Sequence, residues 1–314
     1  MPTFIPWIEK YRPQQLSDMV MNQQLRRKLL NLISLKTIPN IIITGPTGTG
    51  KTTTLYCFAK SFINNPEYLL ELNASDNRGM EYISTSITHF CKKKSDSKKM
   101  IIFDEADNIT NKAQHLLINL IDQYNYNTIF TFTCNESNKI IESIQNRCLM
   151  LYFSPICNEN IIERLKYLCI SENIEYDMQG LSAISYISNG DIRYAINNLE
   201  ATYYCYTKII DVNVYNLCYQ PNPIFISNII EACINKDIKL VINLYKSLKE
   251  QGYCNSDILQ SMINILKNMK GISEALKLKY IKCISDIYLY VVDGIDSDLL
   301  MYSYLSKLIL INNT

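Results

Sequence analysis

Eight consecutive residues near the start of the chain have the types and spacing needed to hold a phosphate group. They match the pattern G-x-x-x-x-G-K-[ST] of a phosphate-binding loop, or P-loop. Its glycines let backbone N–H groups converge on phosphate oxygens, and the positive end of the helix predicted to follow faces the same anion. Lys51 is expected to reach the β- and γ-phosphates of a nucleotide, and the Thr52 hydroxyl to bind Mg²⁺. The predicted nucleotide-binding residues of this segment are Gly45, Pro46, Thr47, Gly48, Thr49, Gly50, Lys51, Thr52 and Thr53.

Adjacent carboxylates supply the second half of such a site. Asp104 and Glu105 directly follow an apolar strand predicted over 100–103. Asp104 is expected to bind the Mg²⁺ shell, and Glu105 to orient and polarise the water that attacks the γ-phosphate. An acidic turn capped by Asp104 is the simpler alternative. The P-loop in the same chain favours the catalytic interpretation.

Asn135 is a third candidate, at the end of a strand predicted over 128–133. If it lies between the P-loop and the carboxylates, its amide would hold the lytic water or contact the γ-phosphate. The same amide would equally well cap the turn that follows the strand. The residue alone leaves both roles open.

Strands and helices alternate around these residues. Short apolar, β-branched runs predict five strands, at 41–44, 68–72, 100–103, 128–133 and 149–153. The segments between them have helical spacing, and a further helix is predicted from residue 17 to 35. This alternation is typical of a parallel α/β sheet that binds its ligand at the carboxyl ends of the strands.

Two breaks divide the chain into three predicted domains. A Ser-Pro pair at 154–155 ends the nucleotide-binding domain, residues 1–154. Residues 155–221 are strand-poor and predict a small helical domain. A Gln-Pro-Asn-Pro segment then leads into an all-helical domain over 222–314, which carries no motif chemistry. Its surplus of Ile, Leu and Tyr suits packing against other subunits.

The composition excludes several other classes of protein. The 314 residues carry a formal net charge of +1, so any contact with nucleic acid must come from a local patch. The lysine-rich segment 92–99 is such a candidate, although a solvated loop is the simpler interpretation. The 11 cysteines form no C-x-x-C pair and there are only two histidines, so a structural zinc site is not expected. The absence of a leader and of a long apolar run predicts an intracellular protein with reduced thiols and no membrane span.

Several segments together resemble the small subunits of replication factor C, the sliding-clamp loader of the AAA+ ATPase class. The similarity runs almost end to end. Residues 7–13 resemble the family's W-x-E-K-Y-R-P, residues 72–79 its L-N-A-S-D-x-R-G, and residues 104–107 its D-E-A-D. Asn135 matches the sensor 1 position. Residues 140–148 resemble the stretch that ends in S-R-C, and residues 190–193 the sensor 2 G-D-x-R. The resemblance implies an AAA+ P-loop domain with a five-stranded parallel sheet, a small helical lid domain and a C-terminal helical collar for oligomerisation.

The resemblance also implies roles for individual residues. The segment with Tyr11 and Arg12 would lie near the adenine of ATP. Arg147 would be an arginine finger that reaches the γ-phosphate bound by a neighbouring subunit, and Arg193 would act in cis, coupling the lid to the nucleotide. A guanidinium stabilises the negative charge of the phosphoryl-transfer transition state. Glu105, Lys51, Asn135, Arg147 and Arg193 are therefore the expected catalytic residues, with Thr52 and Asp104 holding Mg²⁺.

The implied function is that of an ATP-hydrolysing subunit in a heteropentamer of large and small clamp-loader subunits. ATP binding would close the ring around primer–template DNA and open a PCNA-like sliding clamp, and hydrolysis would release the clamp. The expected place of action is the site of DNA replication, in a nucleus or a cytoplasmic viral replication site. Two alternatives remain: a structural subunit with little turnover of its own, and a homohexameric motor or helicase loader.

The chain departs from the family pattern at several positions. Asn146 replaces the Ser that precedes the arginine finger. Ser84, Ser86 and Thr88 stand where the family carries basic side chains that follow the DNA backbone, and Ile118 and Asn119 replace an Arg-Arg pair. Fewer cations predict fewer phosphate contacts and a weaker salt dependence of DNA binding by this subunit.

Overall fold

The computed structural model describes residues 5–34, 38–63, 65–74, 80–95, 97–269 and 271–311, without the side chains of 80–84. The chain divides into two compact units, residues 1–211 and 212–314. The finer division at residue 154 stays a prediction. Among the described residues, no helix combines the length and the apolar character needed to cross a membrane.

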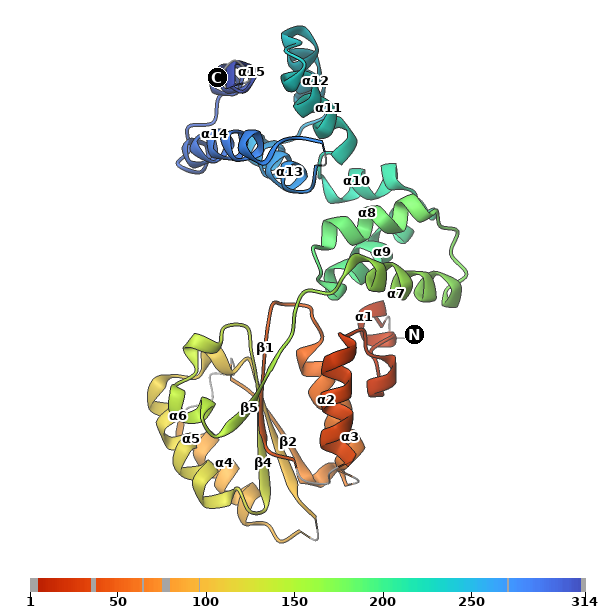
Figure 1. Cartoon of the computed structure of the whole chain (residues 1–314). Helices are drawn as coiled ribbons and strands as arrows, with labels where there is room; N and C mark the ends of the chain where they lie inside the picture. The colour runs from red at the N-terminus through yellow and green to blue at the C-terminus, as the bar shows by residue number, and fades with distance from the viewer. Residues whose placement is uncertain are drawn as a thin grey trace. The chain divides into compact units, whose positions relative to one another are not determined.

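A parallel sheet of five strands lies at the centre of the first unit (Figure 1). The strands are β1 (Asn40–Thr44), β2 (Leu69–Asn73), β3 (Lys99–Asp104), β4 (Thr128–Cys134) and β5 (Cys148–Tyr152). Their order is β2-β3-β4-β1-β5, and every pair is parallel. The predicted five-stranded parallel sheet is therefore confirmed. Because β4 lies between β3 and β1, the residue that follows β4 stands between the carboxylates and the P-loop.

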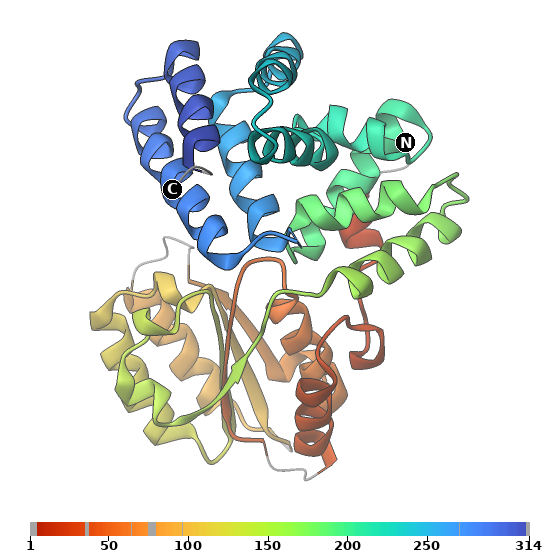
Figure 2. The same cartoon turned by 45° about the horizontal axis from the view of Figure 1, so that its top comes forward.

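Helices cover both faces of this sheet (Figures 1 and 2). Helices α2 (Gln23–Ser34) and α3 (Lys51–Phe62) pack on one face, and α4 (Met80–Lys92), α5 (Asn111–Tyr124) and α6 (Glu142–Gln145) pack on the other. Successive residues of a strand point to opposite faces. In β1 this alternation places Ile41 and Ile43 in the first core and Ile42 in the second. Burial on both faces explains why β1 and β3 contain continuous apolar runs.

A small group of helices completes the first unit. The lid consists of α7 (Asn158–Ser171), α8 (Met178–Ser188) and α9 (Ile192–Tyr206). Asp191 caps α9, because its carboxylate accepts from the backbone N–H groups of Arg193 and Tyr194 at 2.8 and 3.0 Å. A short helix at the start of the chain, α1 (Trp7–Lys10), contacts α9.

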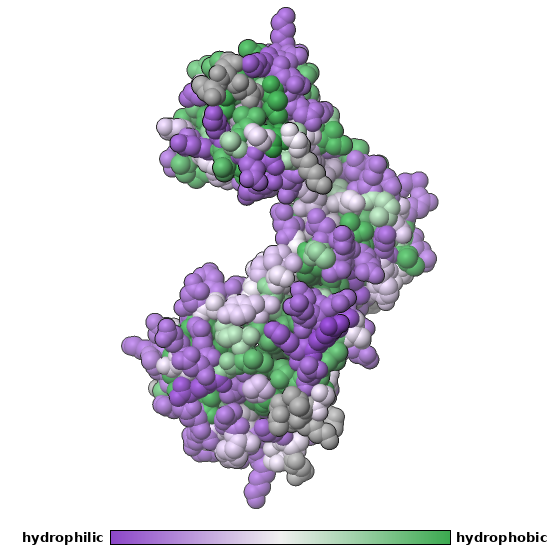
Figure 3. Space-filling model, viewed as in Figure 1, coloured by the Kyte–Doolittle hydropathy of each residue, from purple (hydrophilic) through white to green (hydrophobic). Residues whose placement is uncertain are grey.

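The second unit contains the helices α11 (Pro223–Ile234), α12 (Ile238–Glu250), α13 (Asn255–Asn268), α14 (Glu274–Val292) and α15 (Asp298–Ile311). Their apolar stripes meet in one core that includes Ile230, Tyr280 and Tyr304. Large apolar side chains also remain exposed, among them Leu278, Leu289 and Leu299. The space-filling view shows such hydrophobic residues interspersed with polar ones over this unit (Figure 3).

Two local predictions were wrong, and one helix was missed. The helix expected from residue 17 to 35 is instead the 3-10 helix η1 (Leu16–Asp18), an extended connection and then α2. A further helix, α10 (Asp211–Cys218), was not predicted, because Val214 is its only fully buried apolar residue. Lys99 does not belong to a solvated loop. It is buried at the start of β3, where its Nζ donates to the carbonyls of Phe90 and Cys91 at the end of α4.

Candidate nucleotide-binding site

The P-loop connects the end of β1 to the start of α3. Gly48 and Gly50 have φ angles of +64° and +88°, in the left-handed region that a side chain disfavours. At Gly48 there is a second reason for glycine, since a Cβ atom would lie 1.8 Å from Oδ1 of Asp191. The loop therefore needs its glycines both for its own turn and for the close approach of the lid.

Lys51 is buried at the base of this loop. Its Nζ donates to the carbonyls of Gly45 and Pro46 at 2.8 and 2.7 Å and to Oδ1 of Asn135 at 2.8 Å. Burial lowers the pKa of Lys51, and the nearby Arg193 acts in the same direction, whereas Asp104 opposes this shift. The ammonium lies among polar atoms that a phosphate oxygen can replace.

The predicted Mg²⁺ ligands lie side by side. Thr52 Oγ1 donates to Oδ1 of Asp104 across 2.8 Å, which joins the first turn of α3 to the end of β3. Thr133 on β4 donates to the same carboxylate oxygen. A carboxylate and a hydroxyl are the hard oxygen donors that Mg²⁺ accepts, so this pair fits the ion. The role of Thr133 in the site was not predicted. Thr131 and Thr133 occupy equivalent alternating positions on β4, so the sequence does not distinguish one from the other.

Glu105 follows β3 in an unusual backbone conformation. Its φ angle is +54°, and its N–H donates to Thr133 Oγ1 at 3.1 Å. This conformation turns the exposed carboxylate out of the strand, where Nδ2 of Asn108 donates to it at 3.3 Å. A non-glycine residue with positive φ costs free energy and is frequent at functional sites. The carboxylate is accessible to water, as its predicted role requires.

Asn135 lies at the end of β4, between the P-loop and the carboxylates. Its side chain accepts from Lys51, and its N–H lies 3.4 Å from Oδ2 of Asp107. Asp107 belongs to the 3-10 helix η3 (Ala106–Asn108), and its other oxygen, Oδ1, is buried without a hydrogen bond. The amide of Asn135 therefore points into the site and does not cap the turn. Asp107 is a further residue of the site, and its sequence context predicted no role for it.

Arg147 lies at the opposite end of the sheet. The strands β1 and β5 are parallel with Asn40 opposite Cys148, so Arg147 is beside the start of β1, whereas the P-loop follows its end. The guanidinium is exposed and holds Asp122 through two bonds, at 2.7 and 2.9 Å. Arg147 is thus not brought together with the other candidate residues. Asn146 is also exposed, and its backbone N–H donates to the Glu142 carbonyl at 2.8 Å.

A cavity of about 360 Å³ joins the P-loop, the lid and the start of the chain. Eight predicted residues line it: Tyr11, Arg12, Thr49, Gly50, Thr52, Thr53, Asp104 and Arg193. The lid touches the P-loop directly, since the Ile192 N–H donates to the Gly48 carbonyl at 3.2 Å. Outside the segment 7–13, five apolar wall residues were not predicted, because nothing in their local pattern separates them from core residues: Met19, Val20, Ile156, Ile192 and Ile196.

A larger cavity, of about 830 Å³, adjoins this site and shares five lining residues with it: Met19, Val20, Thr49, Ile156 and Arg164. The predicted Mg²⁺ ligands Thr52 and Asp104 line the smaller cavity and are not among the described residues that line the larger one, so the smaller cavity is the candidate phosphate site.

The residues that depart from the family's DNA-contacting pattern are only partly described. The segment 75–79 and the side chain of Ser84 lie outside the described residues. Ser86 and Thr88 are half-buried on α4. On α5, Ile118 packs against the core between the sheet and the helices α4, α5 and α6, whereas Asn119 is exposed.

Two family models match consecutive parts of the chain. The model for the ATPase family associated with various cellular activities matches residues 41–156, and that for the replication factor C C-terminal domain matches 221–307. A model for type II/IV secretion system proteins matches residues 8–73, which include the P-loop. The first two matches follow the order of domains that the resemblance implied.

Relatives match over nearly the whole chain. A probable replication factor C subunit 2 of Dictyostelium discoideum is 37% identical over 98% of this chain and 93% of its own length. The chain belongs to the replication factor C small-subunit family. A putative small subunit of Acanthamoeba polyphaga mimivirus is also 37% identical, over 98% of both chains, and replication factor C subunit 4 of Saccharomyces cerevisiae is 35% identical over 98% and 97%.

Solved structures agree on the fold of this replication factor C relative. The RuvB Holliday junction branch migration motor of Thermotoga maritima aligns with a TM-score of 0.56 at 17% identity, over 71% of this chain and 79% of its own. Another RuvB structure aligns over 96% and 91%, with a TM-score of 0.57 at 15% identity. This likeness shows the fold alone.

Proposed function

We propose that the chain is an ATP-binding and ATP-hydrolysing subunit of a clamp loader that opens a sliding clamp and loads it onto primer–template DNA. The observation that carries the proposal is the convergence of Lys51, Thr52, Asp104 and Asn135 at one edge of the sheet, below a lid that carries Arg193. Residues from motifs far apart in the sequence lie at this one end of the sheet, and Thr52, Asp104 and Arg193 line one cavity, which supports a shared nucleotide site.

Each residue has a distinct role in this proposal. The P-loop amides and Lys51 bind the β- and γ-phosphates, and Thr52 and Asp104 hold Mg²⁺, which neutralises charge on the phosphate oxygens. Glu105 orients the attacking water and accepts its proton, while Asn135 keeps that water or the γ-phosphate in line. The apolar wall around Ile156 and Ile196, with Tyr11 and Arg12, surrounds the base of ATP.

Arg147 completes the site of a neighbouring subunit. It lies at the far end of the sheet from its own P-loop, so it can stabilise phosphate charge only in another molecule. This geometry favours a ring, which we propose to be a heteropentamer of large and small subunits. The exposed apolar residues of α14 and α15 suit packing of the helical collar against those partners.

Glutamine at position 105 tests the catalytic role. Glu105→Gln keeps the shape of the side chain but removes its ability to accept a proton, so we expect ATP binding to persist and hydrolysis at this site to stop. Turnover is measured in the assembled complex with DNA and clamp present, which also tests whether they stimulate it. Glu136→Gln, at an exposed glutamate paired with Lys139, is the matched control. Unchanged turnover with Glu105→Gln would identify a structural subunit.

Stoichiometry tests the assembly. The native mass of the complex in ATP and Mg²⁺ should correspond to a ring of about five AAA+ chains, one of them larger. Six identical copies would instead indicate a homohexameric motor.

A further inference from the structure

The segment from Trp7 to Gln14, called the arm below, connects two parts of the nucleotide site. Its first residues contact the lid. The backbone N–H of Trp7 donates to Oε2 of Glu200 at 3.1 Å, and the indole ring of Trp7 packs on Tyr203 with 5.6 Å between ring centroids. Its last residues contact α3, where Gln14 accepts from Lys60 at 2.6 Å. Arg12, in between, lies over the ring of Tyr56, 5.1 Å from its centroid.

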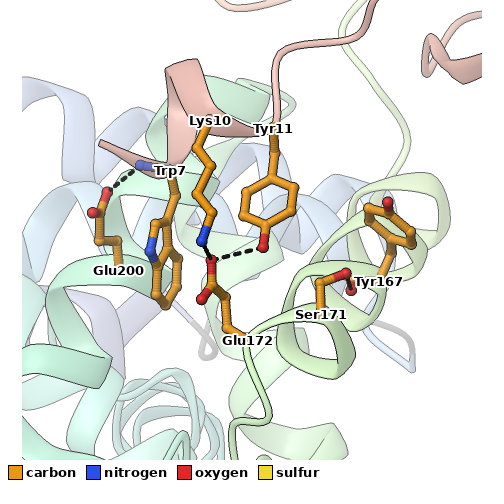
Figure 4. Close-up of polar contacts among 7 residues, drawn as sticks. All are labelled: Trp7, Lys10, Tyr11, Tyr167, Ser171, Glu172 and Glu200. Atoms are coloured by element: carbon orange, nitrogen blue, oxygen red, sulfur yellow. Dashed lines mark hydrogen bonds and ion pairs between the residues drawn. The ribbon is translucent and has the colours of Figure 1, made fainter. Parts of the chain in front are cut away.

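Glu172 is the polar centre of the lid contact. Oε1 of Glu172 accepts from Lys10 Nζ at 2.6 Å and from the Tyr11 hydroxyl at 2.7 Å. Figure 4 shows both side chains pointing from the arm at this one carboxylate. Lys10 and Tyr11 together hold the pKa of Glu172 below its usual range. The carboxylate is therefore ionised and hydrogen-bonded at neutral pH.

Glu172 occupies a position at which a carboxylate does not stabilise its helix. It is the C-cap residue of α7, where the negative end of the helix dipole disfavours a carboxylate. Lys10 and Tyr11 supply the compensating donors. An anion at this position is thus explained by what it binds on the arm.

A second residue of α7 holds the same point of the arm. Arg164 donates from a terminal guanidinium nitrogen to the backbone carbonyl of Tyr11 at 2.7 Å. The rings of Tyr11 and Tyr167 also pack perpendicular to each other, with 6.4 Å between centroids. Three residues of the lid therefore fix Tyr11, and Tyr11 and Arg12 both line the nucleotide cavity.

We propose that Glu172 is a positioning residue for the nucleotide: it holds Tyr11 against the lid and so fixes the wall of the cavity that Tyr11 and Arg12 form. Glu172 does not line that cavity among its described residues, so its effect acts through the arm. The proposal rests on the nucleotide-binding role of the cavity and adds a determinant of affinity that lies on the lid.

The test measures the affinity of the full chain for N-methylanthraniloyl-ATP in Mg²⁺. Glu172→Ala should raise the dissociation constant about 10-fold, the factor expected for one charge-assisted hydrogen bond. Glu172→Gln keeps the acceptor oxygen and should restore most of the affinity. Glu175→Ala is the matched control. Glu175 lies three positions after Glu172 and forms an exposed ion pair with Lys208 at 2.8 Å. It should leave the affinity unchanged.

A double-mutant cycle assigns the effect to Tyr11. Tyr11→Phe should weaken binding as well, and adding it to Glu172→Ala should cost less than the sum of the two changes. In the assembled complex, Glu172→Ala should raise KM for ATP and leave kcat at saturating ATP unchanged. Trp7, the only tryptophan, should shift its emission to the red in this variant because the arm is released.

The outcomes separate the inference from the proposed function. If the wild-type chain binds no nucleotide, the proposed function is wrong. If the wild type binds but Glu172→Ala binds as tightly as Glu175→Ala, the positioning role is wrong and the proposed function stands. Strictly additive effects of Glu172→Ala and Tyr11→Phe would also overturn the positioning role.

Discussion

Lys51 and Asn135 are joined directly: the ammonium of the P-loop lysine donates to the side-chain oxygen of the strand-end asparagine across 2.8 Å. The other two donors of Lys51 are directed at the Gly45 and Pro46 carbonyls. A phosphate that binds Lys51 must therefore replace one of these three acceptors. Two of these acceptors belong to the backbone of the loop, whereas the Asn135 amide can rotate away, so we expect a phosphate bound to Lys51 to change the position of the Asn135 side chain.

Removal of the Asn135 amide should slow hydrolysis more than it weakens binding. Asn135→Ala leaves Lys51 with its two backbone acceptors, so we expect ATP affinity to change little. The turnover number should fall about 100-fold, because a polar group aimed at the reacting phosphate is lost. Steady-state hydrolysis by the assembled complex and equilibrium nucleotide binding measure the two quantities. Asn138→Ala, on the exposed 3-10 helix η4 (Ser137–Lys139), is the control. Equal losses of affinity and turnover would show that Asn135 acts in binding alone.

Asp107 should act through Asn135. Its Oδ2 lies 3.4 Å from the Asn135 N–H and its Oδ1 is buried without a partner. Asp107→Ala removes this acceptor, so Asn135 should lose its fixed position and turnover should fall about 10-fold at unchanged ATP affinity. Asp107→Asn keeps an acceptor oxygen and should retain more activity. The control is the same change in a chain that already carries Asn135→Ala. If Asp107→Ala lowers turnover there by the same factor as in the wild type, Asp107 does not act through Asn135.

Arg147 should affect only the site of a neighbour. Arg147→Ala should leave nucleotide affinity of the isolated chain unchanged and reduce hydrolysis at the adjacent site about 1,000-fold. Arg147→Lys should rescue little, because a lysine cannot reproduce the planar, bidentate guanidinium. Single-turnover hydrolysis in complexes with one active site separates the two sites. Weaker nucleotide binding by the isolated variant would place Arg147 in its own site, contrary to the sheet geometry.

The ion pair of Arg147 with Asp122 should make a pH-dependent contribution to stability. The bond to Arg147 lowers the pKa of Asp122 below its ordinary value of 3.8. A lowered pKa in the folded state stabilises the fold above the unfolded-state pKa, and that contribution is lost as the pH falls through the folded value. The difference in unfolding midpoint between the wild type and Asp122→Asn should therefore be constant at pH 5–7 and shrink below about pH 4. A difference that grows on acidification would contradict the assignment.

The elements that bear the chemistry were predictable because their signals are local. The strands β1, β3 and β4 are buried on both faces, and the P-loop glycines, the carboxylates that follow β3 and Asn135 come directly after these three strands. Contacts between distant segments carry no such signal. Glu172 and Tyr11 are 161 positions apart, and the sequence around either residue does not predict that they are in contact. Arg147 was interpretable only through the family resemblance, since an isolated surface arginine has no pattern of its own.

Lys99 shows how a local rule fails when a side chain finds partners elsewhere, and its contribution to stability can be measured. Its Nζ donates to the carbonyls of Phe90 and Cys91 at 2.8 and 3.0 Å and also to that of Lys93, which caps the end of α4. Lys99→Met keeps the aliphatic stem but leaves these buried carbonyls without their donor, so the free energy of unfolding should fall by about 3 kcal/mol. Lys94→Ala, at an exposed position, should change it by less than about 0.5 kcal/mol. Denaturant titration of the full chain measures both, and a Lys99→Met variant as stable as the wild type would show that the cap contributes nothing.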